Sequence, residues 1–97
     1  MNLDRDSVKA AIRTKVIELA GNLGSDASEL QDGDIIPATG LLDSTGILEL
    51  LVWYETEYDL PLKQHEINID NLGSVSAMTD FLIERKVSVQ TPSDDVG

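Results

Sequence analysis

Two adjacent residues near the middle of the chain, Asp43 and Ser44, have side chains and a setting suited to chemistry. They stand between a turn-forming run and an apolar segment, 47–58, that has the spacing of a helix. A helix that begins here exposes the Ser44 hydroxyl beside unpaired backbone N–H groups and the positive end of the helix dipole. This position favours a phosphate linked to serine. An ordinary role is also open, because Asp43 or Ser44 can serve as a simple N-cap.

Other kinds of chemistry find little support in the residues. A serine nucleophile needs a base, and the single histidine, His65, lies in a distant linker. The Gly-x-Ser-x-Gly turn of hydrolases is absent, because Leu42 stands two positions before Ser44. The acidic run 32–37 begins like a calcium loop but has Ile and Pro where an oxygen ligand and a glycine are needed. We therefore predict no catalytic residue, no metal site and no enzymatic activity.

The composition narrows the class of protein. The 97 residues include 18 acidic and 7 basic side chains, for a net charge of -11, and no cysteine. Such a charge repels nucleic acid and anionic membranes and favours basic protein surfaces. No apolar run is long enough to span a bilayer, and residues 1–6 do not resemble a signal peptide. We expect a monomeric cytoplasmic protein.

Apolar spacing predicts an all-α domain over residues 1–86 and a disordered tail over 87–97. Helices are expected over 4–23, 44–58 and 74–85, with a short irregular helix near 66–71. The long connection 24–43 should pack on the bundle, with a helical turn near 28–30. Expected core positions in the helices are Val8, Ile12, Val16, Leu19, Leu23, Ile47, Leu50, Leu51, Tyr54, Tyr58, Val75, Met78, Phe81 and Leu82, with Leu48 and Val52 widening the stripe. Expected anchors in the connections are Leu30, Ile35, Ile36, Leu41, Leu42, Leu60, Leu62, Ile67, Ile69 and Leu72.

The motif and this layout together resemble the acyl carrier protein family. The residues that carry the resemblance run from Leu42 to Leu51, Leu-Asp-Ser-Thr-Gly-Ile-Leu-Glu-Leu-Leu, and resemble that family's Asp-Ser-Leu motif and the helix after it. Glu55, Glu57 and Tyr58 match its acidic residues and closing aromatic. The resemblance covers about residues 4–86 and implies a four-helix bundle of acyl-carrier type, with three main helices and a short third one.

The resemblance also implies a function. In the family the motif serine, here Ser44, carries 4′-phosphopantetheine, which a phosphopantetheinyl transferase attaches from coenzyme A. The arm then holds an acyl or aminoacyl group as a thioester, loaded by an ATP-dependent ligase and passed to an acyltransferase or synthase. Asp43 would support the attachment. The residues expected to dock partner enzymes are Leu42, Thr45, Gly46, Leu48, Glu49 and Glu55.

Two departures from the usual motif bear on the cargo. Thr45 stands where a leucine usually follows the serine, and Gly46 where an acidic residue often comes next. The motif is thus more similar to D-alanyl and other specialised stand-alone carriers than to fatty-acid synthesis carriers. Gly46 is also expected to leave the surface beside Ser44 open, and Trp53 to lie in the core or shape a cargo groove. The alternative is an acidic helical interaction module without pantetheine, switched by phosphorylation of Ser44.

Overall fold

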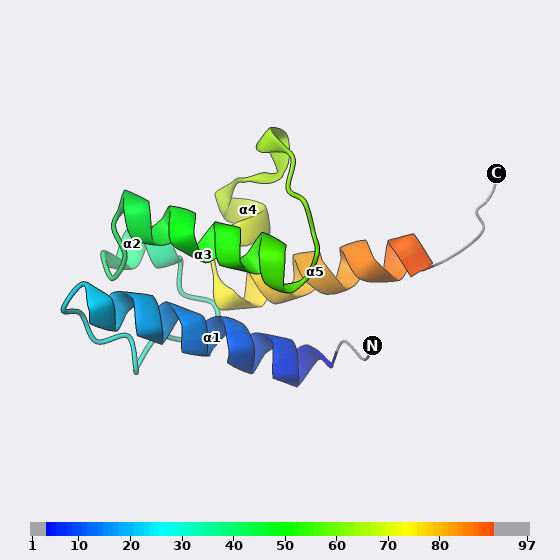
Figure 1. The fold of residues 1–97 in the computed structure, drawn as a ribbon. Helices are drawn as coiled ribbons and strands as arrows, with labels where there is room; N and C mark the ends of the chain where they lie inside the picture. Colours follow the sequence, from blue (N-terminus) through cyan, green and yellow to red (C-terminus); the bar gives the residue numbers. More distant parts are fainter. Residues whose placement is uncertain (1–3, 91–97) are drawn as a thin grey trace.

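Three long helices form the body of the protein, and shorter helical segments occupy the connections between them (Figure 1). The structure is a computed structural model that describes residues 4–90, with side chains as far as Lys86. Its elements are α1 (Arg5–Asn22), α2 (Ile36–Thr39), α3 (Ser44–Glu57), the 3-10 helix η1 (Gln64–Glu66), α4 (Ile69–Leu72) and α5 (Val75–Gln90). The prediction of an all-α bundle of acyl-carrier type is confirmed, with α2 and η1 as additions.

Helix α1 begins and packs as its sequence predicts. The Asp4 side chain accepts a hydrogen bond from the Ser7 backbone N–H at 3.0 Å and caps the first turn. The apolar residues from Val8 to Leu19, at spacings of three and four, are buried against α3 and α5. Leu23 is exposed, contrary to expectation, because it follows the last turn and no longer continues the buried stripe.

Helices α3 and α5 complete the core. Tyr54 is fully buried and donates its hydroxyl hydrogen bond to the Met78 backbone oxygen at 2.8 Å. Burial raises the pKa of the Tyr54 phenol above its usual range. Leu50 is also buried, but Leu48 and Val52 are exposed, so the predicted wide stripe on α3 is wrong. Only one face of α3 meets neighbouring helices, which leaves the opposite flank in solvent.

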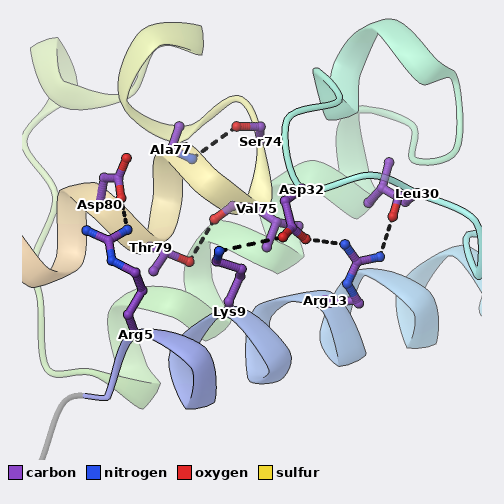
Figure 2. A network of polar contacts seen from close by, with 10 residues as sticks. All are labelled: Arg5, Lys9, Arg13, Leu30, Asp32, Ser74, Val75, Ala77, Thr79 and Asp80. Atoms are coloured by element: carbon purple, nitrogen blue, oxygen red, sulfur yellow. Dashed lines mark hydrogen bonds and ion pairs between the residues drawn. The ribbon is translucent and has the colours of Figure 1, made fainter.

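A row of basic side chains along α1 forms ion pairs with acidic side chains of α5 and of the first long connection (Figure 2). Arg5 pairs with Asp80 on α5, while Lys9 and Arg13 both reach Asp32 in the first long connection. Arg13 also donates to the Leu30 backbone oxygen. The hydrogen bond and charge of Arg13 hold the pKa of Asp32 below its ordinary value.

The connection from 24 to 43 lies on the bundle as predicted, with two differences of detail. Leu30, Ile36 and Leu42 are buried, whereas Ile35 is exposed. Residues 28–29 form a turn, and the helical segment is instead α2. Gly40 ends α2 with a φ of 75°, a left-handed conformation that glycine adopts without strain.

The second connection and the last helix also differ from the prediction. Leu60 and Leu72 are buried core anchors, but Ile67 and Ile69 are 47% and 55% exposed, so these two are not anchors. Ser74 caps α5, its hydroxyl accepting from the Ala77 N–H at 3.0 Å. Helix α5 continues to Gln90, so residues 87–90 of the predicted disordered tail are helical. The rest of that tail lies outside the described residues.

Candidate functional site

The start of α3 presents the Ser44 hydroxyl to solvent. Asp43 is the N-cap residue, and its Oδ1 accepts a hydrogen bond from the Gly46 backbone N–H at 2.7 Å. Ser44 is the first helical residue and is exposed, and its hydroxyl has no hydrogen-bond partner among residues 4–90. Capping is therefore the work of Asp43, which leaves the Ser44 hydroxyl available for modification.

The exposed flank of α3 beside Ser44 carries three of the residues expected to contact partners. Thr45, Leu48 and Glu49 are exposed, and the Leu48 side chain keeps 61% of its surface in solvent. Leu48 lies one turn beyond Ser44 on the same flank of the helix. This flank offers a mainly uncharged surface with Glu49 as its acidic group.

Leu42 and Gly46 are in a different position, because both are buried. Leu42 belongs to the hydrophobic core, and this burial removes its side chain from any docking surface. Gly46 does not leave an opening beside Ser44, contrary to expectation. A Cβ placed there would be 3.3 Å from Leu42 Cβ and 3.4 Å from Leu23 Cδ1, so neighbouring side chains already fill the space.

Glu55 differs from its expected surroundings, whereas Trp53 packs on the core, one of its two expected positions. Glu55 is half-buried, and its Oε2 accepts a hydrogen bond from the Leu62 backbone N–H at 2.8 Å. This carboxylate therefore supports the connection after α3. Trp53 is half-buried, packs edge-on against Tyr58 at 5.8 Å between ring centroids and faces α1. The Trp53 ring packs on the hydrophobic core and also lines a surface hollow between α1 and α3, together with Leu48 and Val52. A separate apolar groove is lined by other residues of α3.

That groove runs between α2, α3 and α4 and has a volume of about 180 Å³. Its walls include Ile36 from α2, Ile47 and Leu51 from α3, and Ile67 and Ile69 from the α4 side. Since Ile47 is three residues after Ser44, the groove begins within one turn of the exposed hydroxyl. A group attached to the serine by a flexible arm can reach an apolar surface there.

The described part of the chain shows no other type of site. Among residues 4–90 no three His, Cys, Asp or Glu side chains come together as a metal site would require. Within the same residues, no helix combines the length and apolar character that crossing a membrane demands.

The comparisons with known proteins agree with this geometry. D-alanyl carrier proteins from three strains of Streptococcus thermophilus are each 30% identical to this chain over 74 residues, covering 75% of it and 92% of their own length. No protein-family model matches, and no solved structure gives a significant match. The helical bundle and its exposed serine agree with a carrier-type protein, and the relatives show that class. The chain belongs to the carrier-protein family that includes the D-alanyl carrier proteins.

Sequence reasoning missed two structural features around the site, helix α2 and the burial of Glu66. Helix α2 was signalled by Pro37 near its start and Gly40 just after its end, a spacing typical of a short helix. Helix α4 overlaps the short helix expected near 66–71, and its start is set by Asn68, whose side chain accepts from the Asn71 N–H at 2.8 Å. Burial of Glu66 has no local signal, because its partner comes from α5.

Proposed function

We propose that this protein is a non-catalytic carrier that holds an acyl or aminoacyl group on a 4′-phosphopantetheine arm attached to Ser44. The observation that carries the proposal is the exposed Ser44 hydroxyl at the first position of α3. Asp43 caps this helix, so the hydroxyl is not used for capping. The D-alanyl carrier relatives support an aminoacyl cargo. When bound, the arm supplies the terminal thiol that this cysteine-free chain lacks.

The residues present fit this attachment. The Ser44 hydroxyl is exposed, so its oxygen can form a phosphodiester bond as its proton leaves and coenzyme A releases adenosine 3′,5′-bisphosphate. The first backbone N–H groups of α3 and the helix dipole stabilise negative charge at that position. Asp43 holds this helix start in place through its bond to Gly46 N. Its exposed carboxylate is also placed to interact with a cation in a partner's active site.

The partners of such a carrier are a phosphopantetheinyl transferase, a ligase that activates the cargo with ATP, and an acyltransferase or synthase that receives it. We expect them to meet the protein in the cytoplasm and to dock on Thr45, Leu48 and Glu49. Basic side chains of this protein are largely paired with its own acidic ones, as along α1. The remaining negative field should speed encounter with basic partner surfaces and weaken as salt is added.

The apolar groove supports a role in covering the cargo. Aliphatic side chains from α2, α3 and the α4 side dominate its walls, so a hydrocarbon portion of an acyl group would be taken out of water there. Loading the pantetheinylated protein with D-alanine, other amino acids and short or medium fatty acids would identify the cargo. Preference for an aliphatic acid over D-alanine would indicate that the groove decides the cargo.

Intact-mass analysis after incubation with coenzyme A, Mg²⁺ and a broad-specificity phosphopantetheinyl transferase tests the proposal. We expect a mass gain of one phosphopantetheine group, absent in Ser44→Ala and retained in Ser28→Ala, which changes an exposed serine outside α3. No gain in the wild-type chain, or a gain that persists in Ser44→Ala, would contradict it. The first of these outcomes would favour the alternative, an acidic interaction module that binds partners without pantetheine.

A further inference from the structure

The connection between α3 and α4 is held to the core in an unusual way. It leaves the end of α3, passes through η1 and returns to the bundle at α4 (Figure 1). Between the buried anchors Leu60 and Leu72, the only buried residue is Glu66, with 8% of its surface exposed. The middle of this connection is therefore attached to the bundle by a charged side chain, where hydrophobic residues would be usual.

Glu66 is bound from two sides. Its carboxylate forms an ion pair with Arg85 of α5, and its Oε1 accepts from the Lys63 backbone N–H at 2.9 Å. Arg85 is itself oriented by the Phe81 ring, whose centroid lies 5.0 Å from the guanidinium carbon. The Glu66–Arg85 pair thus links the connection directly to α5.

The backbone of Glu66 extends this link to α4. Its carbonyl oxygen accepts from the Asn71 side-chain amide at 3.1 Å and from the Asn68 backbone N–H at the same distance. Asn68 in turn caps α4. A displacement of Glu66 would therefore release the first turn of α4 together with η1.

This segment is also a wall of the apolar groove. Ile67 and Ile69 line the groove, but about half of each side chain remains in solvent, so they contribute little to holding the wall. Helix α4 has only four residues, too few to be stable alone. The wall is held in place by the polar contacts of Glu66, by the buried anchor Leu72 and by a hydrogen bond from the Ile36 N–H to the Gly73 backbone oxygen at 2.7 Å.

We propose that the Glu66–Arg85 ion pair is a latch that positions the α4 wall and keeps the groove covered. Glu66 and Arg85 are positioning residues, since neither lines the groove. If Arg85 is removed, the Glu66 carboxylate is left buried without its counter-ion, which is strongly unfavourable. Leu62 anchors the start of the connection, since it packs on the core and donates to Glu55. Outward movement of residues 63–71 into water relieves the buried charge of Glu66, and the groove opens.

Hydrogen exchange of the unmodified chain tests the latch by reporting how often the wall opens. The informative amides are those of Leu72 and Gly73, which donate to the oxygens of Asn68 and Ile69, each at 2.8 Å. In Arg85→Met we expect these amides to exchange at least about tenfold faster, with little change in α1. Binding of the uncharged apolar dye Nile red should increase in the same variant.

Two variants serve as controls. Arg5→Met removes an ion pair between α1 and α5 that is exposed on both sides, so exchange at the α4 amides should not change. The double variant Glu66→Leu/Arg85→Met removes both charges and supplies apolar contact, so exchange should slow again toward the wild-type rate. Unchanged exchange in Arg85→Met, equal acceleration throughout α1, or no recovery in the double variant would overturn the latch.

The idea that the latch shields a bound cargo rests on the proposed carrier function. The hydrogen-exchange test of the latch does not depend on that function. Exchange is measured without pantetheine or coenzyme A, so a negative result leaves the mass-gain experiment on Ser44 unaffected. Conversely, a chain that gains no mass can still show the latch. If both hold, a medium-chain acyl thioester on the pantetheinylated Arg85→Met variant should hydrolyse faster than on the wild-type protein.

Discussion

Replacement of Asp43 by alanine separates the capping of α3 from the chemistry of Ser44. The variant loses the 2.7 Å hydrogen bond to the Gly46 N–H, which costs about 1 kcal/mol at a typical N-cap. It also loses a negative charge at the positive end of the helix dipole, for roughly 0.3–1 kcal/mol more. We expect the free energy of unfolding to fall by about 1–2 kcal/mol, lowering the Tm by roughly 5–10 °C in a domain of this size.

Urea unfolding of the unmodified chain, followed by circular dichroism, measures the effect. Asp43→Asn keeps the acceptor oxygen and loses only the charge, so it should cost about 0.3–1 kcal/mol. Ser44→Ala should lie within about 0.5 kcal/mol of the wild type, because the hydroxyl is exposed. If Ser44→Ala were as destabilised as Asp43→Ala, the serine would be the cap and our account of the site would be wrong.

Three further outcomes follow from the packing. Gly73→Ala should destabilise the protein by about 1–3 kcal/mol in urea unfolding, because the new Cβ would be 2.4 Å from the Ile69 backbone oxygen. The raised pKa of Tyr54 should make stability fall as pH rises above about 10, where the unfolded chain loses the phenol proton first. Arg13→Gln should raise the pKa of Asp32 toward its ordinary value in an NMR titration. The stability that Asp32 contributes near neutral pH, and the loss of that contribution as pH falls, should therefore both become smaller.

Each of these outcomes has a control. Gly33→Ala should be almost neutral, since nothing lies within 4 Å of the added Cβ, and equal losses at both glycines would contradict the steric argument. Tyr54→Phe should lose about 1 kcal/mol with the hydrogen bond and remove part of the alkaline decline. If stability fell at alkaline pH in Tyr54→Phe as steeply as in the wild type, groups other than Tyr54 would be responsible. Lys15→Gln, on the same helix and paired with Glu18, should leave the Asp32 titration unchanged.

The buried residues of the first and last helices can be predicted from the local spacing of apolar residues alone. The α1 and α5 stripes recur at three and four residues, so the buried residues from Val8 to Leu19 and from Val75 to Leu82 follow from the geometry of a single helix. The Asp43-Ser44 start is local as well, since a cap depends only on residues within one turn. The sequence by itself therefore determined the helical class and the position of the exposed serine.

Tertiary structure decided which side chains near the site are exposed and which are covered, because this depends on residues distant in the sequence. Leu48 and Val52 satisfy helical spacing as well as Leu50 does, but they lie on a face of α3 that stays largely in solvent when the helices pack. Gly46 is covered in part by its neighbours Leu42 and Asp43 and in part by Leu23, which comes from the end of α1, and the Leu23 contact arises only in the folded chain. No local pattern carries such information, because it arises only when separate helices pack.

The exposed hydroxyl of Ser44 thus follows from the sequence alone, while its surroundings do not. The short helix α2 lacks enough turns for a periodic signal, and its position depends on long-range contacts. Glu66 reads as an ordinary surface residue until Arg85 of α5 is placed beside it. The groove and its latch therefore exist only in the folded chain, since their walls and their charges come from elements separated along the sequence.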